Sequence, residues 1–420
     1  MLLLGRGVGL PQEDVLPIPD RWHSALWARW IWGFRNITVR VSGGRGAVRL
    51  LPFFETVAFP RLTWDLYRGY EDFSHPGSRK ILTLVPHHPD VLHLHNLHAR
   101  WLRREGFFDL QTLVPLSARI PTILAPQDPW LLTGHCGHPL GCPRWRVGCN
   151  YCPDLAIYPA IRRDGTAYNL RRKRSIYQRA RLHLATPSKW LMEMFEEAGI
   201  EFVDRRVIHN GVDVNLFHPG DQRAGRAALG IGINSKVVLV VGNHLRSNPW
   251  KGLDWVRETA IRLSNEHLSS LVDFVCVGDE GQPEQWDNVR LTFVGKIGRA
   301  EEMARLYQGA DILLHPSRAD TFPFVVLEGM SSALPVVATA VGGIPEQVED
   351  HSSGFLVRAG DTESMLARVR ALVVDDALRR EMGGRGREIV LERFRLDLQV
   401  DAYLHWYQEI LGRRGAERRI

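Results

Sequence analysis

Two acidic residues, Asp320 and Glu328, are separated by seven residues in a largely apolar stretch. A carboxylate at the start of a helix, the place expected for Glu328, can accept two hydrogen bonds from a ribose diol. The backbone N–H groups of the same turn, around Phe324 and Val325, can hold a diphosphate, because helix N-termini attract anions. The simpler alternative is that Glu328 is an acidic residue favoured by the helix dipole.

Two basic residues stand in a loop that follows a predicted strand. Arg246 and Lys251 come after the apolar run 236–242, and Gly252 follows Lys251 directly. Two cations at this point could stabilise negative charge that develops on a bound ligand. The simpler alternative is that both are solvated surface charges, as most basic loop residues are. Only their position directly after a predicted strand favours a role in binding.

The elements that must position these residues alternate between strand and helix. Short β-branched runs, typical of buried parallel strands, predict strands at 236–242, 273–278, 289–295, 312–316 and 335–339. The intervening stretches predict helices at 253–265, 300–307 and 325–332. This alternation predicts a doubly wound α/β domain, whose ligands bind beyond the carboxyl ends of its strands.

The N-terminal half shows the same alternation less clearly. Its apolar runs predict strands at 90–96, 121–125, 182–186 and 207–211, and a linker at 219–230. Ser188 is expected to cap a helix that runs to about Ala198. A last helix at 398–411 would place four residues on one face, namely Val400, Leu404, Tyr407 and Leu411.

The stretch from Asp320 to Glu346 resembles the signature of glycosyltransferase family 4. Between its ends it contains a Pro335-Val-Val-Ala strand and a Gly342-Gly343-Ile-Pro-Glu turn. Segments 90–96, 207–219 and 243–252 resemble further parts of the same family. The matches cover most of residues 80–415.

This resemblance implies an α/β fold of GT-B architecture, in which two Rossmann-like doubly wound parallel-sheet domains face each other across a cleft. We expect an acceptor-side domain at 1–205 and a nucleotide-sugar-binding domain at 206–395. A C-terminal helix at 396–420 would return to the first domain.

The resemblance also implies roles for particular residues. Glu328 would bind the ribose of the donor, and Asp320, where most members have glutamate, would bind the transferred sugar. Lys251 and Arg246 would neutralise the diphosphate, and His95 would lie near the reacting sugar. The remaining donor-binding positions are Phe324, Val325, Asn210, Gly211 and Gly295.

The beginning of the chain departs from the family pattern. Family members open with a strand and a Gly-Gly loop, whereas this chain opens with the segment Gly5–Gly9 after three leucines. We expect that the opening βα unit is missing, which would truncate the first domain and leave it unstable or inactive. The alternative is that Gly5–Gly9 substitutes for the missing loop.

Four of the five cysteines cluster in one insertion, at 128–153, which resembles an insertion of the colanic-acid-type exopolysaccharide transferases. They are Cys136, Cys142, Cys149 and Cys152. Their spacing would allow a structural, tetrahedral Zn²⁺ site with His135 as a competing ligand, and the alternative is reduced thiols that pack as small hydrophobic side chains. No metal is expected in catalysis, and Asp128 and His135 are expected on the acceptor side.

Two basic segments would suit an anionic membrane surface. One extends from Arg162 to Arg181, and the other, from Arg21 to Arg35, mixes arginine with tryptophan as interfacial helices do. The alternative for both is a solvated face with ordinary core aromatics. Docking at the inner face of the membrane would fit a lipid-linked acceptor.

The composition is that of a globular chain with more than one domain. The 420 residues are 45% hydrophobic and 24% charged, with a net charge of +6. No apolar run approaches the ~18 residues of a membrane-spanning helix. Without an export signal, the expected compartment is the cytoplasm.

The expected function is retaining transfer of a sugar from a nucleotide-sugar donor to a saccharide or lipid-linked saccharide acceptor, in cell-surface polysaccharide biosynthesis. The alternatives are a catalytically silent GT-B protein that binds a sugar or a partner enzyme, and a nucleotide-sugar epimerase. A zinc-ribbon protein that binds nucleic acid would leave the stretch from Asp320 to Glu346 unexplained, so no nucleic acid partner is expected.

Overall fold

The computed structural model describes residues 3–4, 15–16, 30–31, 57–71, 75–95, 97, 108–266 and 268–417. The chain forms two compact units. Unit 1 comprises Met1–Ala185, Glu193–Arg206 and Arg413–Ile420, and unit 2 comprises Thr186–Met192 and Val207–Gly412. The predictions for Gly5–Gly9 and for most of the segment from Arg21 to Arg35 fall outside the described residues.

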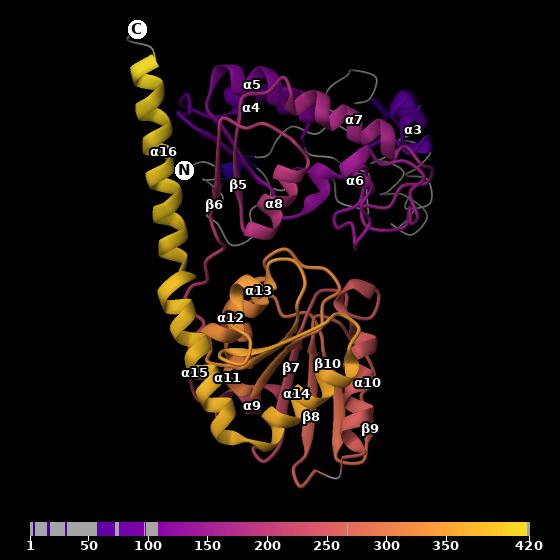
Figure 1. Cartoon of the computed structure of the whole chain (residues 1–420), viewed down its shortest axis with the longest axis vertical. Helices are drawn as coiled ribbons and strands as arrows, with labels where there is room; N and C mark the ends of the chain where they lie inside the picture. Colours follow the sequence, from indigo (N-terminus) through magenta and orange to yellow (C-terminus); the bar gives the residue numbers. More distant parts are fainter. Residues whose placement is uncertain are drawn as a thin grey trace. The chain divides into compact units, whose positions relative to one another are not determined.

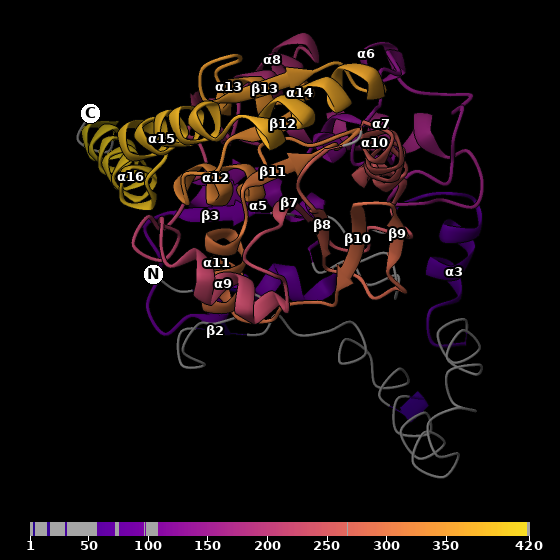
Figure 2. The ribbon, with the colours of Figure 1, turned by 90° about the horizontal axis from the view of Figure 1, so that it is seen from below.

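Unit 2 contains a seven-stranded sheet in the order β13-β12-β11-β7-β8-β10-β9, whose strands are labelled in Figure 2, with β7, β8, β9 and β10 also labelled in Figure 1. Its strands are β7 (Lys236–Val241), β8 (Val272–Val277), β9 (Glu284–Trp286), β10 (Val289–Val294), β11 (Ile312–His315), β12 (Val336–Thr339) and β13 (Gly354–Val357). All neighbours are parallel except β9, which is antiparallel to β10. The chain winds outward from β7 in both directions, so the topological switch point lies between β7 and β11.

Helices lie on both faces of this sheet, and Figure 2 shows α10 and α14 on one side and α9 and α11 on the other. The helices are α9 (Gln222–Leu229), α10 (Leu253–Ser264), α11 (Ala300–Gly309), α12 (Phe324–Ser331), α13 (Ile344–Gln347), α14 (Thr362–Val374), α15 (Asp376–Arg393) and α16 (Leu396–Glu417). A short 3₁₀ helix, η6 (Pro249–Lys251), follows β7.

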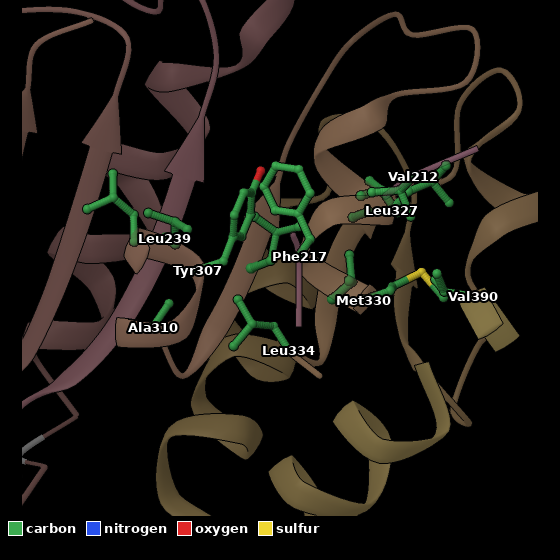
Figure 3. Close-up of a cluster of buried hydrophobic side chains, with 14 of the residues drawn as sticks. Val212, Phe217, Leu239, Tyr307, Ala310, Leu327, Met330, Leu334 and Val390 are labelled. Atoms are coloured by element: carbon green, nitrogen blue, oxygen red, sulfur yellow. The ribbon is translucent and has the colours of Figure 1, made fainter. Parts of the chain in front are cut away.

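Alternate residues of β7 enter two separate cores. Val237 and Leu239 pack with residues of α11, α12 and α15, whereas Val238 and Val240 pack with residues of α10 and α14. Successive side chains of a strand point to opposite faces, so a continuous apolar run requires cover on both. Figure 3 shows part of the first core, where Leu239 and Tyr307 are labelled.

Unit 1 contains a four-stranded sheet in the order β3-β4-β5-β6, in which β3 is parallel to β4 and β4 to β5. Its strands are β3 (Leu92–His95), β4 (Thr122–Ala125), β5 (Leu182–Thr186) and β6 (Asp204–Val207). Two short strands, β1 (Leu3–Leu4) and β2 (Val15–Leu16), pair in parallel. The helices of unit 1 are α3 (Pro60–Tyr67), α4 (Ile81–Leu84), α5 (Leu113–Arg119), α6 (Arg144–Val147) and α7 (Thr166–Tyr177), with the 3₁₀ helices η3 (Pro76–Lys80), η4 (Leu110–Thr112) and η5 (Pro129–Leu132). Helix α8 (Lys189–Glu197) begins in unit 2 and ends in unit 1.

The predicted α/β class with two parallel-sheet domains is confirmed. The predicted cap of α8 is also confirmed, because the Ser188 hydroxyl accepts a hydrogen bond from the Leu191 N–H at 3.2 Å. None of the described helices combines the length and apolarity needed to cross a membrane.

Two predictions near residue 210 are wrong. The strand expected at 207–211 ends at Val207. The Ile208 N–H still donates to the Thr186 carbonyl oxygen at the end of β5 at 2.9 Å, and the Gly211 N–H then donates to Gln399 of α16. The linker expected at 219–230 contains α9, whose first turn is capped by the Asp221 side chain. An aspartate that accepts two backbone N–H bonds starts a helix even where the sequence is rich in polar residues.

The predicted apolar face of the last helix is also wrong. Among the side chains of α16 that the structure describes, those of Trp406 and Ile410 are buried, whereas Val400, Leu404 and Leu411 are exposed. The large indole of Trp406 lies in the core and sets the packed face of α16.

Candidate functional site

The loop after β7 carries Lys251 and packs closely on the loop after β11. Within it, the Asn248 side chain accepts a hydrogen bond from the Trp250 N–H at 3.1 Å. Gly252 has a φ of +65°, and a Cβ at this position would lie 2.0 Å from the Pro316 carbonyl oxygen. The position therefore requires glycine, which alone permits both this conformation and this close approach.

Arg318 connects the same two loops. Its backbone N–H donates to the Trp250 carbonyl oxygen at 2.7 Å, and its guanidinium pairs with both carboxylate oxygens of Asp254. The guanidinium also lies 4.0 Å from the centre of the Trp255 ring. The bidentate pair and the cation–π contact fix the loop that carries Lys251 against the loop that leads to Asp320.

Lys251 and His315 both bind the carboxylate of Asp320. Lys251 Nζ lies 3.1 Å and His315 Nε2 lies 3.2 Å from the same oxygen, Oδ2. Burial raises the pKa of Asp320, but the hydrogen bond from His315 and the charge of Lys251 outweigh burial and hold that pKa well below its usual value. Two residues singled out from the sequence, Lys251 and Asp320, thus form one ion pair.

The predicted Gly-Gly turn supports the backbone of Asp320. Gly342 has a φ of +56°, and a Cβ there would lie 1.7 Å from the Asp320 carbonyl oxygen. Gly343 donates its N–H to the Thr321 carbonyl oxygen at 2.9 Å. The turn after β12 therefore determines where the loop that carries Asp320 lies.

Helix α12 begins at Phe324, directly after Pro323 at the N-cap, and no side chain caps it. Glu328 therefore lies in the second turn of α12, not at its start as predicted. Its Oε2 accepts a hydrogen bond from the hydroxyl of buried Tyr307 at 2.7 Å. Burial raises the pKa of Glu328, and this hydrogen bond offsets part of the rise.

Arg246 contacts the loop after β8. Its backbone N–H donates to Asp279 Oδ2 at 2.8 Å, and its guanidinium donates to the Glu280 carbonyl oxygen at 3.1 Å. Gly295 follows β10, and its carbonyl oxygen accepts a hydrogen bond from Gly278 at 3.2 Å. Arg246 and Gly295 therefore lie on the β8 and β10 side of the carboxyl edge of the sheet, whereas Lys251 binds Asp320.

Asn210 and Gly211 make hydrogen bonds within the framework of unit 2. Asn210 is buried, and its Nδ2 donates to the Phe322 carbonyl oxygen at 3.4 Å. The Gly211 N–H donates to Gln399 Oε1 in α16 at 3.0 Å. This segment therefore connects α16 to the loop that precedes α12.

His95 is exposed at the end of β3 in unit 1, as predicted for the tip of that strand. Its ring lies 4.1 Å from that of His93. Burial and the nearby His95 lower the pKa of His93 to about 3. His93 is therefore neutral at physiological pH.

The insertion at 128–153 is attached to α7 by a buried ammonium group. Lys173 donates to the carbonyl oxygens of Trp130 and Thr133 at 2.9 and 3.0 Å, and forms an ion pair with Glu71 at 2.7 Å. Burial lowers the pKa of Lys173, and the charge of Glu71 acts against this. Asp128 caps η5 through the Trp130 N–H at 2.9 Å.

The four clustered cysteines line one small pocket together with His135. All are free thiols, and His135 Nε2 lies 3.3 Å from Cys152 Sγ. Within the part of the chain that the structure describes, no group of three or more His, Cys, Asp or Glu side chains is placed to hold a metal ion. The zinc interpretation therefore gains no support from the structure.

Sequence reasoning missed His315 and Tyr307. Each lies in or beside an apolar run and is buried, so each is readily taken for a core residue. A histidine directly after the apolar run Ile312–Leu314, five residues before Asp320, is the signal that could have drawn attention to His315.

Residues 235–375 match the family described as Glycosyl transferases group 1. This stretch lies in unit 2 and contains Lys251, His315, Asp320 and Glu328. The matched region therefore includes these four polar residues near the carboxyl edge of the seven-stranded sheet.

Curated relatives include D-inositol 3-phosphate glycosyltransferases from Mycobacterium tuberculosis (strain ATCC 25618 / H37Rv) and from Mycobacterium bovis (strain BCG / Pasteur 1173P2). Each is 34% identical over 231 residues, which cover 50% of this chain and 45% of the relative. The chain thus spans about half the length of the curated relatives it matches.

Solved structures of similar fold include sucrose-phosphate synthase from Thermosynechococcus elongatus, with a TM-score of 0.58 and 20% identity over 80% of this chain and 78% of that one. Anabaena Alr3699/HepE in complex with UDP has a TM-score of 0.56 and 19% identity over 80% of this chain and 82% of that one. The chain is a protein of the GT-B fold class. Its residues 235–375 are similar to the group 1 glycosyl transferases.

Proposed function

We propose that this protein is a retaining, hexosyl-type glycosyltransferase that uses a nucleotide-sugar donor. The observation that carries the proposal is the cluster at the carboxyl edge of the sheet of unit 2. There Lys251 is paired with Asp320 at 3.1 Å, and α12 follows with an N-terminus that no side chain caps. The domain that contains this cluster matches the group 1 glycosyl transferases.

In this proposal the donor nucleotide binds to α12 and the loops around it. Glu328 accepts hydrogen bonds from the ribose through the lone pairs that Tyr307 leaves available. The first N–H groups of α12, at Phe324 and Val325, receive the diphosphate together with Lys251 and Arg246. We take UDP as the first probe, because HepE was solved with UDP and with UDP-glucose.

The same proposal accounts for retention without a protein nucleophile. The diphosphate leaves towards the cations, whose charge stabilises it most when its own charge is greatest. The acceptor hydroxyl then attacks from the face that the diphosphate has left. Asp320 binds the hydroxyls of the transferred sugar, and the role assigned to His95 is that of a residue for the reacting sugar.

The acceptor side is assigned to unit 1, with Asp128 and His135 among its residues. We propose a saccharide or a lipid-linked saccharide as the acceptor, in cell-surface polysaccharide synthesis of the colanic-acid type. The basic segment from Arg162 to Arg181 supports docking to an anionic cytoplasmic membrane surface, because such segments attract anionic lipids. Vesicle flotation that shows no preference for anionic over neutral lipid would contradict the proposed docking to the membrane.

Glu328→Gln tests the nucleotide site. The variant keeps an acceptor for the Tyr307 hydroxyl but loses the charge offered to the ribose, so UDP binding should weaken by about 1.5–3 kcal/mol in calorimetry. Glu363→Ala, an exposed first-turn residue of α14, is the matched control and should leave UDP affinity unchanged. Equal UDP affinity in the Gln variant and the wild type would contradict the site.

Turnover tests the reaction itself. With UDP-glucose and a saccharide acceptor, the anomeric proton coupling of the product reports retention or inversion. A product formed from the donor alone would instead support an epimerase or a hydrolase.

A further inference from the structure

His315 is a buried histidine to which the proposed glycosyl transfer assigns no role. It is the last residue of β11 and is 3% exposed. Its preceding neighbours Leu313 and Leu314 enter the two cores on opposite faces of the sheet. By this alternation the His315 side chain lies on the same face as Leu313, which is the face that α12 covers.

The two donors to Asp320 bind the same oxygen. Lys251 Nζ and His315 Nε2 approach Oδ2 at 3.1 and 3.2 Å, and neither of these bonds uses Oδ1. A carboxylate held through one oxygen has a defined plane, so its second oxygen has a defined direction. Oδ1 is therefore the oxygen that these contacts leave for a ligand.

The two donors differ in what else they can do. Lys251 has a flexible side chain with a quarter of its surface exposed, and it is the cation assigned to the diphosphate. An ammonium that turns towards a diphosphate gives up part of its contact with Asp320. His315 is fixed by the end of a central strand and is buried, so its bond to Oδ2 does not depend on the diphosphate.

We propose that His315 is a positioning residue that holds Oδ2 of Asp320, so that Oδ1 is directed to a hydroxyl of the donor sugar while Lys251 binds the diphosphate. This inference rests on the proposed function and extends it, because it assigns the orientation of the sugar-binding carboxylate to a group that does not touch the donor. Arg318 is another cation of the neighbouring loop, but its guanidinium is paired with Asp254 and does not take the place of His315 as a donor to Asp320.

Two variants of His315 separate positioning from mere packing. His315→Gln keeps an N–H donor at about the distance of Nε2, whereas His315→Leu fills the space without a donor. Loss of a hydrogen bond to a charged group corresponds to about a tenfold to hundredfold fall in kcat/KM for UDP-glucose in His315→Leu. His315→Gln should recover most of this loss, and the Kd of UDP should stay within about twofold of wild type in both.

The pH profile supplies a readout that packing would not change. The titratable groups that face Asp320 are Lys251 and His315, and both hold its pKa below the usual value. With the His315 donor removed, the pKa of Asp320 rises, so the acidic limb of kcat/KM should move to higher pH in His315→Leu. In His315→Gln the limb should stay close to that of wild type.

A measurement without any donor sugar tests the hydrogen bond directly. In protein labelled with ¹⁵N at the imidazoles, His315→Gln identifies the His315 ring signals by their loss. These signals should shift in Asp320→Asn and stay in place in Asp254→Asn, a matched change in the neighbouring ion pair. Unchanged His315 signals in Asp320→Asn would overturn the proposal.

The failure of this inference differs from the failure of the proposed function. If Asp320→Asn abolishes turnover while His315→Leu matches wild type in rate and pH profile, the inference alone is wrong. If Asp320→Asn keeps full turnover and Glu328→Gln keeps full UDP affinity, the proposed site is wrong and the inference falls with it.

Discussion

Asp320 and Lys251 are 69 residues apart in the chain and 3.1 Å apart in the structure. Their meeting could be predicted, because loops after neighbouring parallel strands share the carboxyl edge of a sheet. The partners of the two predicted carboxylates could not be predicted in the same way. His315 and Tyr307 are buried in runs that look like ordinary core, and only the fold shows that their polar atoms face Asp320 and Glu328.

Gly342→Ala should disturb the site through the backbone of Asp320. The left-handed conformation alone costs an alanine about 1–2 kcal/mol, and the added Cβ would also meet the Asp320 carbonyl oxygen. We expect a lower free energy of unfolding in urea and weaker UDP binding.

Gly384→Ala is the matched control for this substitution. Gly384 is exposed within α15, and an added Cβ meets nothing there within 4 Å. Alanine at this helical position should raise stability by about 0.5–1 kcal/mol. If Gly342→Ala and Gly384→Ala both raised the free energy of unfolding, a side chain at position 342 would not strain the turn.

At the level of elements, the central strands β7, β8, β10, β11 and β12 could be predicted from their β-branched runs. The edge strand β9 could not, because its sequence Glu-Gln-Trp is polar and it pairs on one side only. Helix α9 looked like a linker because it contains few large apolar residues, and the Asp221 cap rather than an apolar stripe defines its start. A strand that is buried on both faces has a continuous apolar sequence and is therefore easily predicted. A helix cap or the pairing of an edge strand depends on a few residues and gives a weaker sequence pattern.

Glu346→Ala should destabilise the start of α8. The Glu346 carboxylate accepts hydrogen bonds from the backbone N–H groups of Lys189 and Trp190 at 2.8 and 2.9 Å. Loss of such a cap costs about 0.5–2 kcal/mol, which urea unfolding would measure. Glu381→Ala, on an exposed position of α15, should change stability far less, and equal effects of the two variants would exclude a specific cap.

For the molecule as a whole, one half-buried thiol, Cys136, and one buried thiol, Cys276, report on the two compact units separately. Cys136 lies in unit 1 and Cys276 lies in the core of unit 2. Cys276 is shielded by the core of unit 2, whereas Cys136 is half-buried beside the small pocket of the insertion in unit 1. The accessibility of the two thiols therefore measures the integrity of each unit within the full chain.

Both thiols should resist alkylation in the native protein. Burial raises the pKa of Cys136 and of Cys276 to about 12, so at pH 8 roughly one molecule in ten thousand carries either thiolate, and the thiolate is the reactive form. Iodoacetamide labelling followed by peptide mass spectrometry should show both cysteines modified at least about a hundredfold more slowly than in guanidinium-unfolded protein. Because the pKa is raised, the native rate should still increase with pH above about pH 10, where the thiol of an ordinary cysteine is almost fully ionised and its rate levels off. Rapid labelling of Cys276 alone at pH 8 would show that the core of unit 2 opens while unit 1 stays closed, which contradicts the packing described for β8.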